Sequence, residues 1–196
     1  MSVVLVDAGG TNIGSVRYAL QRLGVDAALT SDATTIRAAD KVILPGVGAA
    51  GPGMARLREL GLVEVLRALS QPVLGVCLGM QLLCAHSEEG DTECLGLIPA
   101  PVRRFIEAPN LRVPHMGWNR LRTTQAHPLV SGVVDDDQVY FVHSYAVPTG
   151  DFTIASTEHA GEFSAIVARG NFHGVQFHPE RSATVGARLL KNFLSL

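Results

Sequence analysis

Within residues 1–90, short uninterrupted apolar runs alternate with stretches in which apolar residues recur at helical spacing. The uninterrupted runs are rich in β-branched residues, which is typical of strands buried on both faces. We predict such strands at residues 3–6, 41–44 and 73–76. Because parallel strands need a crossover between them, the alternation predicts an α/β fold with an open, mostly parallel sheet flanked by helices.

The stretches at helical spacing predict helices with recognisable ends. In the first, Thr11 or Asn12 is placed to cap the helix and Gly24 to end it. The apolar face between them consists of Ile13, Val16, Ala19, Leu20 and Leu23. Residues 54–70 predict a second helical region, which we expect to break near Gly61.

After residue 90 the chain changes to short strand-like pieces separated by turn residues. Turn residues gather at Pro99-Ala100-Pro101 and at Pro109-Asn110, and a helical pattern returns at residues 185–194. The strand-like pieces are residues 139–142, 152–156, 165–168 and 172–177. Since no repeat or linker interrupts the chain, we predict that the second half adds extra antiparallel strands to the same core. Residues 1–196 are therefore expected to form a single domain.

Composition and charge exclude several classes of protein. Hydrophobic residues make up 47% of the chain and charged residues 17%, which is too apolar for a disordered protein. The formal net charge of −2 offers no basic surface to nucleic acid. The apolar run at residues 3–6 ends at Asp7, and no stretch is long enough to span a bilayer. We therefore expect a soluble, cytoplasmic protein that binds neither nucleic acid nor a membrane.

The three cysteines, Cys77, Cys84 and Cys94, are an odd number and form no C-x-x-C pair. This argues against a disulfide framework and against a structural zinc site. If Cys77 and Cys84 share a helix, their spacing separates them by about 10 Å, beyond disulfide reach. Free thiols are expected, and one of them is a candidate for chemistry.

Cys77 lies in the segment Gly75-Val76-Cys77-Leu78-Gly79, between a predicted strand and a predicted helix at residues 78–84. This is the form of a nucleophile elbow, in which glycines flank the nucleophile because the backbone turns too sharply for side chains nearby. The start of the helix favours the reactive thiolate, and the Leu78 N–H points at a developing oxyanion. Taken alone, the pattern fits equally well a strand–helix junction that happens to contain a small hydrophobic residue.

His178 is the candidate base, because a thiolate needs a partner that can later protonate a leaving amine. Pro179 favours an extended backbone at His178, which places Glu180 on the same side and lets it hold the imidazole. His86, His127 and His159 are expected to be structural. A metal site made of His173, His178 and Glu180 is disfavoured because zinc hydrolases use more closely spaced ligands. We expect no metal and no cofactor.

A glycine loop, Pro45-Gly46-Val47-Gly48, follows the predicted strand at residues 41–44. Open α/β sheets bind ligands outside the carboxyl ends of their strands, so this loop is a candidate second oxyanion donor. A plain glycine turn is the alternative. Residues 9–15 (GGTNIGS) do not form a phosphate loop, because Thr11 interrupts the glycine pattern and no Lys precedes Ser15.

Together these segments resemble class I, or triad-type, glutamine amidotransferases. The matching strings are Pro45 to Gly48, Gly75 to Gln81 (GVCLGMQ) and Gln176 to Glu180 (QFHPE), in that order. Within this family, further strings are similar to the glutaminase subunits of imidazole glycerol phosphate synthases. These strings are Ser87 to Gly90 (SEEG), Pro114 to Asn119 (PHMGWN) and Tyr140 to Tyr145 (YFVHSY).

The resemblance implies a role for each matching residue. Cys77, His178 and Glu180 would form the catalytic triad. Gly46, Val47 and Leu78 would line the oxyanion region. Gly48, Gln81, Glu89, Ser144 and Tyr145 would hold the substrate, glutamine. His115, Met116, Trp118 and Asn119 would face a partner, whereas composition alone would make the single Trp a core residue.

By the same resemblance, the partner is a synthase (cyclase) subunit with a (β/α)8 barrel, which pairs with this chain in a heterodimer. Ammonia released from glutamine would pass to it for histidine biosynthesis, and the free glutaminase subunit would be weakly active. Two alternatives stay open at this point. One is a class I glutaminase serving pyridoxal phosphate, anthranilate or purine synthesis, and the other is a catalytically silent binding module of the same fold.

Overall fold

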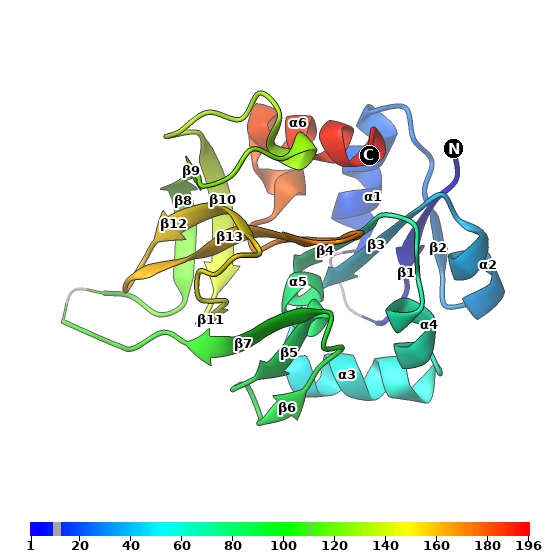
Figure 1. The fold of residues 1–196 in the computed structure, drawn as a ribbon, viewed down its shortest axis with the longest axis horizontal. Helices are drawn as coiled ribbons and strands as arrows, with labels where there is room; N and C mark the ends of the chain where they lie inside the picture. Colours follow the sequence, from blue (N-terminus) through cyan, green and yellow to red (C-terminus); the bar gives the residue numbers. More distant parts are fainter. Residues whose placement is uncertain (10–12, 110) are drawn as a thin grey trace.

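An eight-stranded sheet runs through the molecule (Figure 1). The computed structural model describes residues 1–9, 13–109 and 111–196. Five neighbouring strands are parallel: β2 (Ala28–Thr30), β1 (Val3–Val6), β3 (Lys41–Gly46), β4 (Val73–Cys77) and β14 (Phe172–Val175). Beyond β14 the sheet continues antiparallel through β13 (Glu162–Arg169), β12 (Thr153–Glu158) and β9 (Arg122–Thr123). The predicted mostly parallel sheet with extra antiparallel strands is confirmed.

Helices cover both faces of the parallel strands. In Figure 1, α1 (Ile13–Arg22) and α6 (Ala183–Leu194) lie above the sheet. The helices below it or at its edge are α2 (Ala33–Ala38), α3 (Ala50–Glu59), α4 (Val63–Arg67) and α5 (Leu78–Leu83). Within β1, Val3 and Leu5 belong to the core with α1, while Val4 and Val6 belong to the core with α3. Burial on both faces explains why these strands are uninterrupted apolar runs.

The predicted break near Gly61 is confirmed. Gly61 has a φ of +65°, a conformation that ends a helix and that favours glycine. The helical region begins four residues earlier than predicted, at Ala50, and ends earlier, at Arg67. The predicted caps Thr11 and Asn12 lie outside the described residues.

Two smaller sheets complete the second half. One pairs β8 (His115–Arg120) antiparallel with β10 (Gln138–His143). The other has the order β11 (Tyr145–Ala146), β7 (Ile98–Arg104), β5 (Cys84–Ser87) and β6 (Thr92–Glu93). Two short 3-10 turns, η1 (Pro128–Val130) and η2 (Pro179–Arg181), precede the C-terminal helix.

Pro99-Ala100-Pro101 lies inside strand β7, so the turn predicted there is wrong. The side chains of Ile98, Ala100 and Val102 are buried, while those of the two prolines point to the more exposed side. Period-two alternation therefore prevails over the turn preference of proline, which is tolerated where its missing N–H is not needed.

The three thiols are free, as predicted, and all three are buried. They do not share a helix, because α5 ends at Leu83 and Cys84 begins β5. Burial raises the pKa of Cys94 to about 11 and raises that of Cys84 further still. These two thiols are inert at neutral pH, which leaves Cys77 as the thiol available for chemistry. No helix in the described part of the chain is long and apolar enough to cross a membrane.

Candidate active site

Cys77 occupies a strained turn between β4 and α5. Its φ of 54° and ψ of −110° lie outside the regions that residues with side chains usually adopt. A Cβ on Gly79 would lie 1.8 Å from the carbonyl oxygen of Leu44, and one on Gly75 would lie 2.6 Å from the backbone of Gly79. The prediction that crowding requires glycine on both sides of Cys77 is confirmed.

His178 reaches this turn from the segment that follows β14. Its φ of −95° and ψ of 98° are extended, as predicted from Pro179. Its backbone N–H donates to the carbonyl oxygen of Tyr140 over 2.9 Å. The Ser182 hydroxyl donates to the His178 carbonyl over 2.6 Å and accepts from the Tyr140 N–H over 2.9 Å. These bonds fix the backbone that carries the imidazole.

Glu180 holds the imidazole through a buried contact. Its Oε1 lies 2.9 Å from His178 Nδ1, and its side chain is 1% exposed. The predicted pair forms, but the predicted reason for it is wrong. Glu180 lies in the 3-10 turn η2 and not in extended chain, so the tight turn, and not strand alternation, brings the two side chains together.

The pKa of His178 is raised to about 10 against the effect of its burial. Burial alone lowers the pKa, because it penalises the charged imidazolium. Hydrogen bonds and charge interactions with Cys77 and Glu180 outweigh that penalty. His178 is therefore protonated at neutral pH while it contacts Cys77, which suits it to deliver a proton to a leaving group.

A pocket of about 370 Å³ opens beside these residues. Cys77, Leu78, Val47 and His178 line it, together with Pro114, Val142 and His143. The five predicted substrate residues, Gly48, Gln81, Glu89, Ser144 and Tyr145, also line it. Side chains and backbone from β4, α5, the glycine loop and the β10–β11 segment thus meet in one space. The size fits an amino acid.

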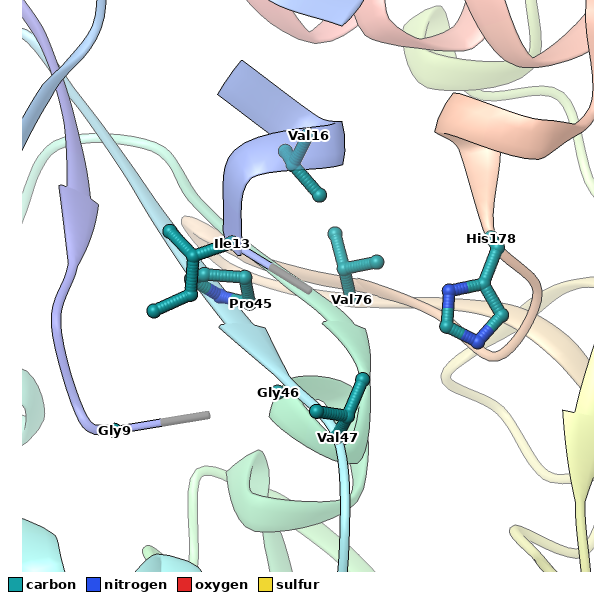
Figure 2. A pocket seen from close by; sticks show the side chains of 8 residues that line it. All are labelled: Gly9, Ile13, Val16, Pro45, Gly46, Val47, Val76 and His178. Atoms are coloured by element: carbon teal, nitrogen blue, oxygen red, sulfur yellow. The ribbon is translucent and has the colours of Figure 1, made fainter. Parts of the chain in front are cut away.

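A second, smaller cavity of about 10 Å³ lies against His178 (Figure 2). Gly46 and Val47 line it, with an apolar wall that includes Ile13, Val16 and Val76. In Figure 2, His178 and Ile13 lie on opposite sides of this cavity. A cavity of this size holds about one small molecule such as water. The oxyanion roles of Gly46, Val47 and Leu78 stay predictions.

Gln176 was not singled out from the sequence, although it is the first residue of the QFHPE string. It is fully buried, and its Nε2 lies 3.7 Å from Cys77 Sγ. Its Oε1 accepts a hydrogen bond from Gln81 Nε2 over 2.9 Å. An N–H donor directed at the sulfur favours negative charge there. Its position two residues before His178 is the one signal that pointed to it.

Glu89 is held at the start of a helix. Its Oε2 accepts a hydrogen bond from the Ala50 N–H over 2.9 Å, at the beginning of α3. Ala49, which precedes that helix, has no side chain able to cap it. The positive end of α3 therefore binds this carboxylate and fixes it beside the pocket.

His173 lies away from this site. Its Nδ1 is 3.3 Å from the carbonyl oxygen of Val73, at the opposite end of β4 from Cys77. The metal site made of His173, His178 and Glu180, which the sequence disfavours, therefore has no geometric basis. Among the described residues, no three His, Cys, Asp or Glu side chains gather where they could hold a metal ion.

Strand β8 presents different residues on its two sides. Met116 is 63% exposed and Trp118 is 52% exposed, so the expectation of a core tryptophan is wrong. Trp118 packs edge-on against Tyr140 at 5.9 Å, and the Arg181 guanidinium lies 4.5 Å from the same ring. His115 is 5% exposed, so its side chain is too deeply buried to contact a partner as predicted.

Comparison with known proteins agrees with this geometry. Residues 4–196 match the family described as glutamine amidotransferase class-I. The chain belongs to this family. It is 58% identical over 194 residues to the imidazole glycerol phosphate synthase subunit HisH of Xylella fastidiosa strain Temecula1. It is 57% identical over the same length to the subunit of that name from Xanthomonas euvesicatoria pv. vesicatoria strain 85-10. Each alignment covers 99% of this chain and 97% of the relative.

Solved structures share the fold at much lower identity. A putative GMP synthase protein from Thermoplasma acidophilum aligns with a TM-score of 0.78 at 18% identity, covering 100% of this chain and 92% of the other. PurLQS from Thermotoga maritima aligns with a TM-score of 0.74 at 18% identity, covering 99% and 97%. The resemblance to class I glutamine amidotransferases predicted from the sequence is confirmed.

Proposed function

We propose that this chain is the glutaminase subunit of an imidazole glycerol phosphate synthase and acts in histidine biosynthesis. The observation that carries the chemistry is the single pocket in which Cys77 and His178 meet the five residues expected to hold glutamine. Similarity to HisH proteins over 99% of the chain supports the particular pathway. On this proposal residues 1–196 act as one glutamine amidotransferase domain, in the cytoplasm.

In the first half of the reaction, the Cys77 thiolate attacks the side-chain carbonyl carbon of glutamine. The negative oxygen that forms is stabilised by backbone N–H groups of the oxyanion region, for which Leu78, Gly46 and Val47 are the candidates. His178 gives its proton to the amide nitrogen as the carbon–nitrogen bond breaks. Ammonia leaves, and a γ-glutamyl thioester remains on Cys77.

In the second half, water attacks the thioester and His178 accepts a proton from it. The carbon–sulfur bond breaks, glutamate leaves and the thiolate is restored. The net reaction converts glutamine and water into glutamate and ammonia. Nucleophile, base and orienting carboxylate are all side chains of this chain, so the proposed chemistry needs no cofactor.

The released ammonia serves a synthase (cyclase) partner. We propose that this partner is a (β/α)8 barrel and that it pairs with this chain as a heterodimer. Met116 and Trp118, exposed on the outer side of β8, and the partly exposed Asn119 are candidate contacts. The partner uses ammonia to produce imidazole glycerol phosphate and an aminoimidazole carboxamide ribonucleotide.

The direct test is a glutaminase assay of the wild-type chain and of Cys77→Ser, each with and without the synthase and its nucleotide substrate. Wild type should hydrolyse glutamine rapidly only in the complete mixture, since the glycine loop is expected to rearrange on activation. Near-normal turnover by Cys77→Ser would overturn the nucleophile assignment. Full activity of the chain alone would overturn the requirement for a partner.

Neither alternative matches these observations as well. A silent binding module has no reason to hold His178 protonated against Cys77 through a buried carboxylate. A glutaminase of another pathway shares the fold, but at 18% identity the GMP synthase-like neighbour supports the fold alone. Labelling of Cys77 by a glutamine-analogue electrophile separates an active site from a silent one.

A further inference from the structure

A line of buried side chains connects strand β8 to the catalytic pocket. His115 on β8 and His143 on β10 face each other across the antiparallel pair. Their ring nitrogens, Nδ1 of His115 and Nε2 of His143, are 3.0 Å apart. Both residues are buried, at 5% and 6% exposure. His143 also lines the pocket that holds Cys77.

The end of this line nearest the pocket has a fixed direction. His143 Nδ1 lies 2.8 Å from the carbonyl oxygen of Tyr145, which can only accept a hydrogen bond. The proton therefore sits on Nδ1. Burial lowers the pKa of His143 to about 3, so the ring is neutral and Nε2 carries a lone pair. His115 must then donate to it from Nδ1.

The outer end of the line fixes the same direction independently. Asn119 Nδ2 donates to the carbonyl oxygen of Glu158 over 2.9 Å, while Asn119 Oδ1 accepts from the Arg120 N–H over 2.8 Å. These two backbone groups settle which way the amide points. Asn119 Nδ2 also lies 3.2 Å from His115 Nε2. His115 Nε2 therefore accepts a hydrogen bond from the Asn119 amide. Burial lowers the pKa of His115 to about 4, which agrees with a neutral ring.

At its inner end the line meets the residues around the nucleophile. The Tyr145 carbonyl accepts a second hydrogen bond, from Gln81 Nε2 over 2.9 Å. The same Gln81 nitrogen donates to Gln176, whose own amide nitrogen faces Cys77 Sγ. Both N–H groups of Gln81 are thereby used inside the protein, and only its oxygen is available to a substrate. The Tyr145 carbonyl is therefore one of the two acceptors that hold the Gln81 amide, and Gln81 in turn holds Gln176.

We propose that His115 and His143 are positioning residues of the glutaminase site, which tie Asn119 on β8 to the Tyr145 carbonyl and thereby hold Gln81 and Gln176 beside Cys77. This inference rests on the proposed function. The two histidines need not touch glutamine. They act through a chain of hydrogen bonds in which each group donates to the next, from Asn119 to the Tyr145 carbonyl. A shift of β8 would therefore move the Tyr145 carbonyl beside the pocket.

The protonation states are tested on the wild-type chain with ¹⁵N-labelled histidine, by the imidazole nitrogen shifts in NMR at pH 7.5. Both His115 and His143 should be neutral and carry their proton on Nδ1, which is the minor form of free histidine in water. A proton on Nε2 of His143, or a charged ring at either position, would overturn the proposal. This measurement needs no partner and no activity.

The positioning role is tested with His143→Phe in the complex with the synthase and its nucleotide. Phenylalanine keeps a ring in the cluster but removes both hydrogen bonds. If losing these buried hydrogen bonds raises the barrier by about 1.4 kcal/mol, kcat/KM for glutamine falls about tenfold. The reaction of Cys77 with a glutamine-analogue electrophile should slow by a larger factor than its reaction with iodoacetamide, which needs the thiolate but not Gln81. A merely structural role would not separate these two reagents.

The matched control is His159→Phe. His159 stacks on His115 at 4.2 Å, but its Nε2 pairs with the Arg112 carbonyl, outside the line. The kcat/KM of His159→Phe for glutamine should stay within about twofold of wild type, because the substitution removes no hydrogen bond of the line. If His143→Phe and His159→Phe behave alike, the positioning role is wrong. If the wild-type complex itself hydrolyses no glutamine, the proposed function has failed and not this inference alone.

Two further variants keep the test decisive if His143→Phe does not fold. His143→Asn retains an N–H for the Tyr145 carbonyl but loses the acceptor for His115, so it should recover part of the lost kcat/KM. His115→Phe breaks the line one link further out and should lower kcat/KM in the same direction as His143→Phe. Equal loss in His143→Asn and His143→Phe, or no loss in His115→Phe, would contradict the proposal.

Discussion

The proposed catalytic centre and the pair of histidines behind it, His115 and His143, both bury imidazoles, yet the pKa values of His178 and His143 shift in opposite directions. The pKa of His178 is raised to about 10, while that of His143 is lowered to about 3. Burial by itself lowers the pKa of both histidines, because it penalises the charged imidazolium. His178 faces Cys77 and Glu180, whereas His143 faces a carbonyl and another neutral histidine. Charged partners therefore decide whether a buried histidine delivers protons or only directs hydrogen bonds.

Removing Cys77, the proposed nucleophile, should have the largest effect. Cys77→Ala should lower glutamine turnover in the complex by on the order of 10⁴-fold or more, because no other side chain can form the thioester. It also removes one of the two side chains that raise the His178 pKa, so that pKa should fall. Turnover is measured by glutamate release and the pKa by NMR titration. An unchanged His178 titration would show that Glu180 alone accounts for the contrast with His143.

The next largest effect should come from Glu180→Gln, which keeps the shape of the side chain and removes its charge. The pKa of His178 should fall, because one of the interactions that raise it is lost. Turnover should fall about 100-fold as the protonated imidazole becomes less stable and less well oriented. A pH–rate profile checks both. A profile that does not move would contradict the role given to Glu180.

The buried histidines should make the folded chain less stable both at acidic pH and at strongly basic pH. His115 and His143 stay neutral in the folded chain down to about pH 4 and about pH 3, whereas in the unfolded chain a histidine gains its proton near pH 6.5. The unfolded state therefore binds more protons as the pH falls below 6.5, and stability decreases by about 1–3 kcal/mol per histidine. His178 acts the other way. Its contribution is complete below pH 6.5 and is lost as the pH rises through about 10.

Denaturant unfolding at a series of pH values measures this dependence. The decrease between pH 6.5 and pH 4 should be smaller in His143→Phe than in wild type, because one neutral histidine is gone. His159→Phe is the control, because that ring stacks on His115 but lies outside the hydrogen-bonded line. An acid decrease identical in wild type and His143→Phe would contradict the neutral state of the cluster.

The smallest effect on the free chain should be that of Trp118→Ala. The side chain is half exposed, so stability should change by no more than about 1 kcal/mol. Binding of the synthase should weaken about tenfold or more if this ring is a central contact. Calorimetry with the purified partner measures it, and unchanged affinity would remove Trp118 from the proposed interface.

Local sequence was enough to predict the parallel half of the sheet and the catalytic turn. The runs at β1, β3 and β4 are apolar throughout because both faces are covered, and that pattern is visible in the residues themselves. The crowding around Cys77 was likewise predictable, because glycine at Gly75 and Gly79 has a local cause.

The rest depended on contacts between distant residues. The prolines of β7 indicate a turn until their strand partners are known. The burial of His115 arises from packing against Phe105, Phe141 and Phe163, which lie far apart in the chain. The position of Gln176 beside Gln81 and Cys77 could not be predicted, because these residues lie far from it in the sequence. Resemblance supplied the candidate substrate residues, and the structure brings them to one pocket.

The most direct test of Cys77 as the nucleophile is mass spectrometry of the complex quenched in acid during glutamine turnover. We predict a γ-glutamyl group on the peptide that contains Cys77, and none on those that contain Cys84 or Cys94. Turnover without any adduct on Cys77, or an adduct on another residue, would contradict it.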